Sequence, residues 1–190
     1  MRKSELLVVF YLLQDNANVR KNIRQIAADL SLSIGSVFNA LKKLQDNGFL
    51  IETDGLHLLR KRSILIDRWA KAYPAFREKN LIARFSFLNR QIRQLWADIR
   101  LSTTLSWGGE PAAALLDGYI QPQRWDMYAA DNANALIATA RMIPSAQGEI
   151  YVYKRFWHTD GTPMLVIYAD LLATGDDRCR EAAERIKPHI

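Results

Sequence analysis

The sequence of 190 residues contains one cysteine and three histidines, and each scarcity excludes a kind of site. A single cysteine, Cys179, leaves no partner for an internal disulfide and no cysteine cluster that could hold zinc. The histidines, His57, His158 and His189, lie far apart and lack the spacing of metal ligands. The serines lack the Gly-x-Ser-x-Gly motif of a nucleophile elbow. We therefore expect no metal, no other cofactor and no catalytic residue, which means a protein that is not an enzyme.

Long hydrophobic runs are also missing. No stretch of about 18 uncharged apolar residues occurs, so no membrane-spanning helix is predicted. The apolar stretch at residues 6–13 is short and runs into Gln14 and Asp15 without a small-residue cleavage site, so no signal peptide is predicted. Because a single cysteine also suits a reducing compartment, we expect a cytoplasmic protein with no membrane partner.

Positive charge is distributed unevenly along the chain. The net charge is +6; residues 1–80 contain 14 of the 26 basic residues and 8 of the 20 acidic ones, so the whole excess lies there. Residues 81–190 are neutral overall. A basic segment beside a neutral one indicates that the first part binds a polyanion, although a charge of this size also occurs for solubility alone.

The first part of the chain shows the pattern of a small helical bundle. Residues 4–13 are apolar on nearly every side, which predicts a buried helix. A turn rich in asparagine is predicted next, at Asn16, Asn18 and Asn22. A second helix is predicted from an apolar stripe at helical spacing, which consists of Ile23, Ile26, Ala27 and Leu30.

A third, longer helix is predicted after a short turn. Ser33 is a good N-cap residue for its start, and Gly48 favours the left-handed conformation that ends a helix. Its buried stripe consists of Val37, Leu41 and Leu44, with Ile34 at its start. Two helices joined by a tight turn, the second one longer, are typical of a helix-turn-helix.

The exposed face of this third helix carries side chains suited to DNA. Gly35 permits close approach to the major groove, and Ser36 and Asn39 can hydrogen-bond to base edges, with Asn suited to adenine. Phe38 either packs on a neighbour or contacts a thymine methyl group. Two lysines one turn later can reach phosphates, namely Lys42 and Lys43.

Two strand-like segments follow, at residues 49–53 and 56–60, and the Asp54-Gly55 pair between them is typical of a hairpin turn. A hairpin directly after a recognition helix is typical of a wing, and Arg60-Lys61-Arg62 follows where a wing would meet the DNA backbone. Residues 1–62 therefore predict a winged helix-turn-helix DNA-binding domain rather than a helical bundle with a plain hairpin. The side chains expected to contact DNA are Ser33, Gly35, Ser36, Asn39, Lys42, Lys43, Arg60 and Lys61.

Residues 63–80 are expected to connect two domains. Within them, residues 64–73 have one apolar side and predict a helix, which we expect to stop before Pro74. No Gly/Ser-rich linker lies in this region, so the two domains are expected to be firmly coupled.

Residues 81–190 alternate between strand-like and helical segments. This predicts a C-terminal α/β domain around a mixed sheet and, for the whole chain, the α+β class. Strands are predicted at 84–87, 103–107, 124–129, 150–157 and 164–169, the last as a buried central strand. Helices are predicted at 88–101, 110–116, 132–141 and 176–187.

Gly108-Gly109, between a predicted strand and a predicted helix, is a place where backbone N–H groups can bind phosphate. Nucleotidyltransferases follow such a turn with carboxylates that hold two metal ions. Asp126 and Asp170 follow here, but Arg124 occupies a position where a second carboxylate is needed. The four residues Gly108, Gly109, Asp126 and Asp170 are therefore candidates for a vestigial nucleotide site in a degenerate nucleotidyltransferase-like fold. Alternatively, the glycines make a tight turn, Asp126 forms a surface salt bridge and Asp170 caps a strand end.

Four phrases of the sequence resemble one family. They are RWAKAY at 68–73, WGGEPAAALLDGY at 107–119, YADLLATGD at 168–176 and EAAERI at 181–186. Together they are similar to the AbiEi-type antitoxins of type IV toxin–antitoxin systems, which act in abortive infection, and the resemblance covers most of residues 20–190.

The resemblance implies an N-terminal winged helix that represses its own operon by binding the operator as double-stranded DNA. It also implies a C-terminal domain that counters a nucleotidyltransferase-type toxin without forming a stable complex with it. We therefore expect a DNA-binding transcriptional regulator of the antitoxin type. Two alternatives remain: a nucleotide-binding or nucleotidyltransferase-like enzyme domain fused to a DNA-binding module, and a transcription factor that senses a small effector.

Overall fold

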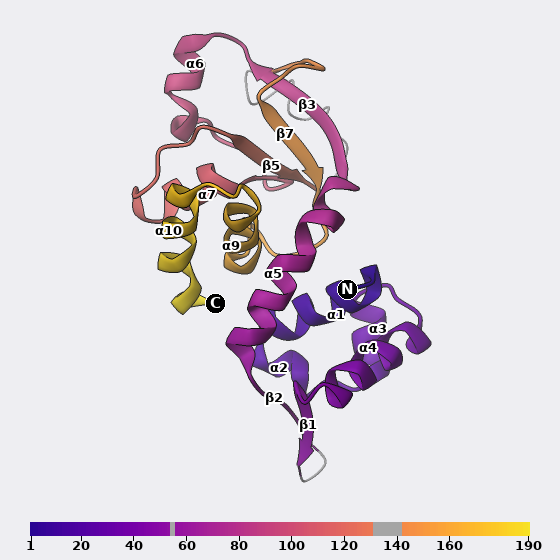
Figure 1. Cartoon of the computed structure of the whole chain (residues 1–190). Helices are drawn as coiled ribbons and strands as arrows, with labels where there is room; N and C mark the ends of the chain where they lie inside the picture. The colour runs from indigo at the N-terminus through magenta and orange to yellow at the C-terminus, as the bar shows by residue number, and fades with distance from the viewer. Residues whose placement is uncertain (54–55, 131–141) are drawn as a thin grey trace. The chain divides into compact units, whose positions relative to one another are not determined.

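A computed structural model describes residues 1–53, 56–130 and 142–190 of the chain (Figure 1). The chain divides into two compact units: Met1–Tyr73 with Ile190, and Pro74–His189. Among the described residues, no helix is long and apolar enough to cross a membrane. The predicted helix at 132–141 lies outside the described residues.

The N-terminal unit contains four helices followed by a hairpin. They are α1 (Lys3–Gln14), α2 (Asn16–Val19), α3 (Ile23–Asp29), α4 (Ile34–Asp46), β1 (Leu50–Thr53) and β2 (Leu56–Leu59). The strands β1 and β2 pair antiparallel, with Leu50 opposite Leu59. Helices α1, α3 and α4 and the hairpin occur where the sequence predicts them. The single-turn helix α2 replaces the turn expected at Asn16 and Asn18, because Asp15 caps it by accepting a hydrogen bond from the Ala17 N–H.

Local signals set the limits of α3 and α4. Asn22 and Gln25 form a capping box at the start of α3. Ser33 caps α4, as predicted, because its side-chain oxygen accepts a hydrogen bond from the Ser36 N–H at 3.2 Å. Gly48, with φ +67°, follows α4 in the left-handed conformation that glycine adopts without strain. These signals fix where α3 begins and where α4 begins and ends.

Helix α1 is the centre of the N-terminal core. It is buried on nearly every side, which agrees with its uninterrupted apolar sequence, and α4 packs against it through Val37, Ala40 and Leu44. The indole of Trp69 donates a hydrogen bond to the Leu6 carbonyl at 2.9 Å. Burial of this apolar set supplies the main stabilising free energy of the unit.

Helix α5 (Arg62–Glu78) is longer than predicted, because it continues through Pro74. A proline inside a helix removes one backbone hydrogen bond and crowds the carbonyl four residues earlier. Side chains on both sides of Pro74 hold the helix in place: Tyr73 stacks on Trp69 at 4.7 Å between ring centroids, and Arg77 is bound by buried carboxylates. The expectation that the helix stops before Pro74 was therefore wrong.

Within the described residues, the C-terminal unit is built around a five-stranded sheet in the order β4-β5-β7-β3-β6. The strands are β3 (Leu81–Phe87), β4 (Leu105–Gly108), β5 (Trp125–Ala129), β6 (Met142–Pro144) and β7 (Ile150–Lys154). Strands β5 and β7 run parallel and the other neighbours antiparallel, so the sheet is mixed. With the helical N-terminal unit, this confirms the α+β class.

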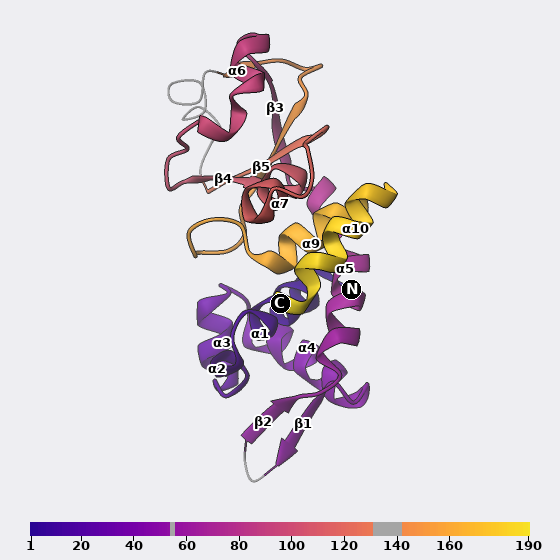
Figure 2. The ribbon, with the colours of Figure 1, turned by 90° about the vertical axis from the view of Figure 1, so that its left-hand side faces the viewer.

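The helices of this unit are α6 (Arg90–Gln94), α7 (Gly109–Asp117), α9 (Met164–Ala173) and α10 (Asp177–Ile186), with short 3-10 turns η1 (Trp96–Asp98) and η2 (Lys187–His189). Helix α7 packs on β4 and β5, α9 packs on α7 and β4, and α10 packs on α9 (Figures 1 and 2). Three helices therefore cover the β4–β5 end of the sheet.

Two sequence predictions in this unit were wrong. Residues 164–169 belong to the buried helix α9 and do not form a central strand. The prediction failed because a short apolar run without alternation is compatible with either a helix or a strand. The helix predicted at 88–101 is only the short α6 followed by η1. Asn89 caps α6 and Leu95 leaves the helical conformation, so the predicted helix is interrupted. The side chains of Leu88 and Leu95 are about half exposed.

Candidate functional site

The exposed face of α4 presents four residues at helical spacing: Gly35, Phe38, Asn39 and Lys42. All four are exposed, and a Cβ atom added to Gly35 would meet no other atom of the protein within 4 Å. The opposite side of α4 is buried. The backbone of α4 is therefore accessible at Gly35. The amide of Asn39, the ammonium group of Lys42 and the ring of Phe38 lie around this position.

Ser33 and Ser36 lie together at the start of this face. The Ser33 hydroxyl donates a hydrogen bond to the Ser36 hydroxyl over 2.8 Å, and the same Ser33 oxygen caps α4. Ser33 is exposed, whereas Ser36 is half-buried. The Ser36 hydroxyl keeps its own proton available for a further acceptor, so a hydrogen bond to a base or phosphate is compatible with this arrangement.

Lys43 differs from its neighbour Lys42. Its ammonium group donates a hydrogen bond to the Glu5 carboxylate at 2.8 Å, and the Glu5 side chain is only 11% exposed. This ion pair joins α4 to α1. No charged partner is seen for the Lys42 ammonium among the described residues, so of the two lysines Lys42 has its charge more fully available to a polyanion.

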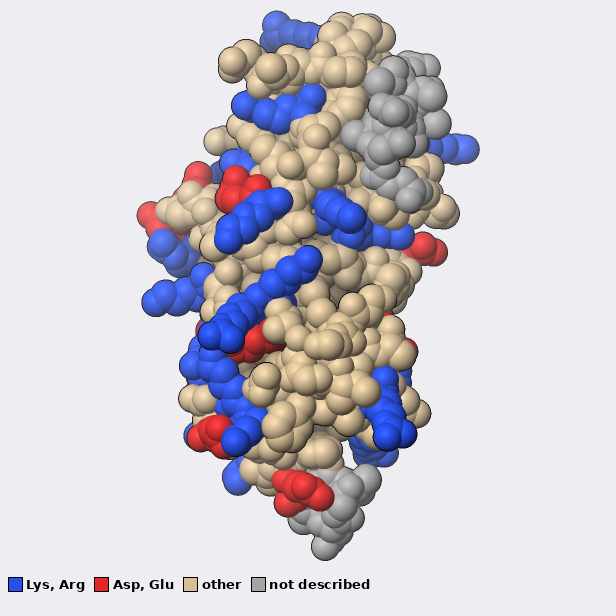
Figure 3. All heavy atoms as spheres, turned by 90° about the vertical axis from the view of Figure 1, so that its right-hand side faces the viewer, with Lys and Arg blue, Asp and Glu red and all other residues tan. Residues whose placement is uncertain are grey.

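Arg60 and Lys61 follow the hairpin and are both exposed. The Arg60 N–H donates to the Phe49 carbonyl at 2.8 Å, which ties the end of the hairpin to its start, and Lys61 has φ +52°. The hairpin tip, Asp54-Gly55, lies outside the described residues. On the face of the molecule drawn in Figure 3, basic side chains predominate over acidic ones.

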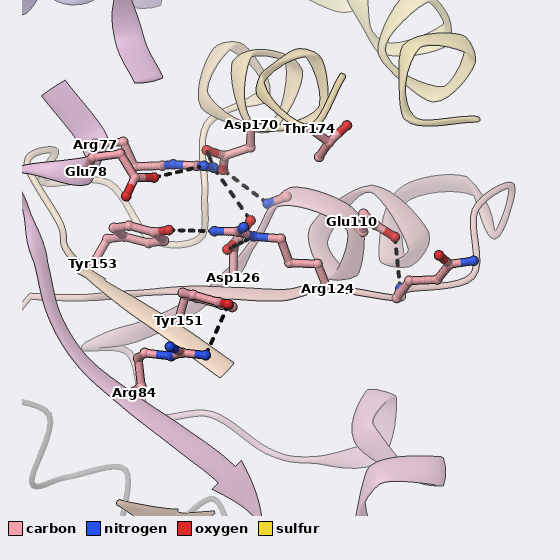
Figure 4. A network of polar contacts seen from close by, with 12 residues as sticks. Arg77, Glu78, Arg84, Glu110, Arg124, Asp126, Tyr151, Tyr153, Asp170 and Thr174 are labelled. Atoms are coloured by element: carbon pink, nitrogen blue, oxygen red, sulfur yellow. Dashed lines mark hydrogen bonds and ion pairs between the residues drawn. The ribbon is translucent and has the colours of Figure 1, made fainter. Parts of the chain in front are cut away.

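In the C-terminal unit, the structure brings together the four candidates for a vestigial nucleotide site (Figure 4). The Gly109 N–H donates a hydrogen bond to Asp170 at 3.1 Å, and an added Cβ atom at Gly109 would lie 2.8 Å from an Asp126 oxygen. Asp126 is on β5, but Asp170 is on α9 and not at a strand end. Both carboxylates are buried, so neither the surface salt bridge nor the strand cap considered from the sequence is correct.

Arg77, from the end of α5, completes this cluster. Its guanidinium lies 2.9 Å from Asp170 and 3.6 Å from Asp126, and it is only 5% exposed. Arg124 binds the other side of Asp126 at 2.9 Å, and the Tyr128 hydroxyl donates to Asp170 at 2.8 Å. Each carboxylate is thus neutralised by a guanidinium, which is the pairing that buried charges require.

Burial sets the ionisation behaviour of this cluster. It raises the pKa of Asp170 to about 6, against the opposing effect of Arg77. Burial and then the charge of Asp126 raise the pKa of Tyr153 to about 12. Although burial alone lowers the pKa of Arg77, the charges of Asp170 and Asp126 raise it above its ordinary value. At neutral pH the cluster is a neutralised structural network.

The role of Arg77 was missed in the sequence. One signal was present: Trp69, Tyr73 and Arg77 recur every four residues, which places the arginine on the buried stripe of α5. A charged residue on a buried stripe needs a buried partner of opposite charge, and the two aspartates provide it.

Comparison with protein families adds the identity of the C-terminal unit. A family model described as a transcriptional regulator, the AbiEi antitoxin of a type IV toxin–antitoxin system, matches residues 57–190. Together with the α+β architecture, this match assigns the protein to the class of transcriptional regulators. The chain belongs to the family of AbiEi antitoxins of type IV toxin–antitoxin systems.

The match begins at His57, within β2, so α1 to α4 lie outside it. Comparison with curated proteins and with solved structures gave no significant match.

Proposed function

We propose that this protein binds the operator DNA of its own operon through α4 and the β1–β2 hairpin, and so represses transcription of that operon. In this proposal Asn39 reads a base edge in the major groove, and Ser33, Ser36 and Lys42 contact the groove or its phosphates. Arg60 and Lys61 contact the backbone beside the hairpin, and Lys43 contributes less because Glu5 already binds it.

The observation that carries this proposal is the exposed face of α4. Gly35 leaves the helix backbone open to close approach, and the exposed side chains of Asn39 and Lys42 flank it, with no hydrogen bond or ion pair to the described residues. The order of helix, tight turn, longer helix and hairpin is that of a winged helix-turn-helix. The basic excess of residues 1–80 supports a polyanionic partner.

Two substitutions on this face are expected to weaken DNA binding in different ways. Asn39→Ala is expected to cost about 1–3 kcal/mol on the specific site and little on unrelated DNA, because it removes a base contact. Lys42→Ala is expected to weaken binding to all sequences similarly, because it removes a phosphate contact. Titration of the protein into labelled upstream DNA and into scrambled DNA of equal length measures both effects.

Matched controls lie elsewhere in the same unit. Gln45→Ala changes an exposed amide at the other end of α4, and Lys71→Ala removes an exposed charge on α5. Both are expected to bind like the unmodified protein. If Asn39→Ala and Lys42→Ala bind as tightly as these controls, α4 is not the recognition helix.

The proposal extends to the partner of the antitoxin. We propose that the toxin is of the nucleotidyltransferase type, and that this protein counters it in the cytoplasm without a stable complex. The family description, which is that of a type IV antitoxin, supports a toxin partner. Co-expression with such a toxin should restore growth, while the two proteins should elute separately in size-exclusion chromatography.

We also propose that Gly108, Gly109, Asp126 and Asp170 now serve the fold and not nucleotide chemistry. The two carboxylates are engaged by Arg77 and Arg124, and the glycines are required where α7 starts close against β5. The function of the cluster is to join β4, β5, α7 and α9 to the end of α5.

A further inference from the structure

Two apolar side chains on α4 are about half exposed among the residues that the structure describes. Ile34 is 52% exposed and Phe38 is 55% exposed, and they lie one turn apart on the same side of the helix. An aromatic ring in water loses the stabilisation that burial of its apolar surface would give. The prediction that Ile34 begins the buried stripe of α4 was therefore wrong.

Their position relative to the other exposed residues indicates what they contact. At about 100° per residue, Gly35 and Lys42 define the centre of the exposed face of α4. Asn39 lies on one flank of that centre, and Phe38 lies on the other. A partner that approaches over Gly35 therefore meets the amide of Asn39 and the ring of Phe38 side by side.

We infer that Phe38, with Ile34 beside it, contacts the 5-methyl groups of thymines in the major groove. This inference rests on the proposed DNA-binding function and adds a rule of specificity to it. The thymine methyl is the one apolar group that the major-groove edge of a base pair presents, and aromatic and aliphatic side chains are its usual partners. The cationic Lys42 on the same face favours nucleic acid over an apolar protein surface.

The two flanks of α4 then read neighbouring base pairs by complementary chemistry. Asn39 pairs best with the N6 and N7 atoms of adenine, and Phe38 contacts the methyl group of thymine. Both groups belong to A·T pairs. The operator is therefore expected to contain consecutive A·T pairs at the positions that face the first two turns of α4.

Replacing thymine by deoxyuridine tests this inference directly, because it removes only the methyl groups. Binding of the full-length protein to the upstream DNA is expected to weaken about fourfold for each contacted methyl group lost, the effect of removing one buried methylene-sized group. Phe38→Ala is expected to weaken binding to thymine DNA and to lose most of the preference for thymine over deoxyuridine DNA, and the double variant Ile34→Ala/Phe38→Ala is expected to bind the two DNAs alike. Phe38→Leu, which keeps an apolar side chain, is expected to retain part of the preference.

Leu115→Ala removes an equally exposed apolar side chain from α7 and serves as the control, with an unchanged thymine preference. Equal binding of thymine and deoxyuridine DNA by the unmodified protein, while Asn39→Ala still weakens binding, would overturn the inference and leave the proposed function standing. Absence of any sequence-specific binding would overturn both. A change of oligomeric state in Phe38→Ala, with the thymine preference intact, would assign the ring to an interface between copies and also overturn the inference.

Discussion

Arg77 is the residue on which the C-terminal network depends. One guanidinium serves two buried carboxylates, Asp170 at 2.9 Å and Asp126 at 3.6 Å. Removing one partner of a buried charged group leaves the other with its full cost of desolvation. Removal of the Arg77 side chain would leave Asp170 buried without its guanidinium partner. Asp126 would also lose Arg77 but would still be bound by Arg124.

Arg77→Met is therefore expected to lower the free energy of unfolding by about 3–5 kcal/mol, because methionine keeps much of the volume but none of the charge. Urea denaturation at neutral pH measures this loss. Glu78→Gln is the matched control, because it removes a different ion pair of Arg77. The Glu78 side chain is 59% exposed, so this ion pair is expected to contribute less than about 1 kcal/mol to the free energy of unfolding. A loss in Arg77→Met no larger than in the control would show that the network does not stabilise the fold.

The exposed side chains could be predicted at this scale, whereas the paired ones could not. The apolar stripe of α4 predicts that Asn39 and Lys42 face outward, and they do. The ion pair between Lys43 and Glu5 joins residues 38 positions apart, so it depends on how α1 packs against α4. Sequence spacing within one helix contains no information on that packing. The same limit applies to Arg77 and Asp170.

At the scale of elements, the sequence predicted helices and strands best where a local signal marks their ends. Ser33 and Gly48 bracket α4 as expected. Helix α9 was mistaken for a strand because its apolar run is uniform, and only packing on both sides decides between the two forms. Helix α5 passed through Pro74 because contacts on either side of it outweigh a local cost.

Pro74→Ala is expected to stabilise the protein, by about 1–3 kcal/mol, because it restores the missing backbone donor inside α5. The smaller conformational freedom of proline in the unfolded chain reduces this gain by less than about 1 kcal/mol. Thermal unfolding should therefore show a higher midpoint for the variant. Ala75→Gly, at an exposed position of the same helix, should lower it. A lower midpoint for Pro74→Ala would mean that α5 needs the geometry that proline imposes.

At the scale of the whole molecule, the separation of charge along the chain was evident from the sequence. Residues 1–80 contain the entire net charge of +6, and the neutral remainder contains most of the matched family region. In the proposed function, the basic unit binds the polyanion and the neutral unit is left free for a different role. The antitoxin family assignment is consistent with such a division.

This separation predicts the salt dependence of DNA binding. With Lys42, Lys43, Arg60 and Lys61 as phosphate contacts, the logarithm of the binding constant should fall against the logarithm of salt concentration with a slope of about −3 to −4 per protein chain. Lys61→Ala should reduce the slope by about 0.9. Arg90→Ala, which removes an exposed charge from the C-terminal unit, should leave it unchanged. An equal reduction by both variants would show that the DNA contacts are not confined to the N-terminal unit and would contradict the prediction.

Gly35 shows what α4 gives up under the proposed function. Alanine is the better helix former, and a methyl group at this position would meet no other atom of the protein within 4 Å. A search for more stable sequences that considered the isolated chain alone would therefore replace this glycine. If α4 binds DNA as we propose, the replacement would keep the fold and fill the space through which the helix approaches the groove. The selective value of Gly35 would then lie wholly in a molecule other than its own.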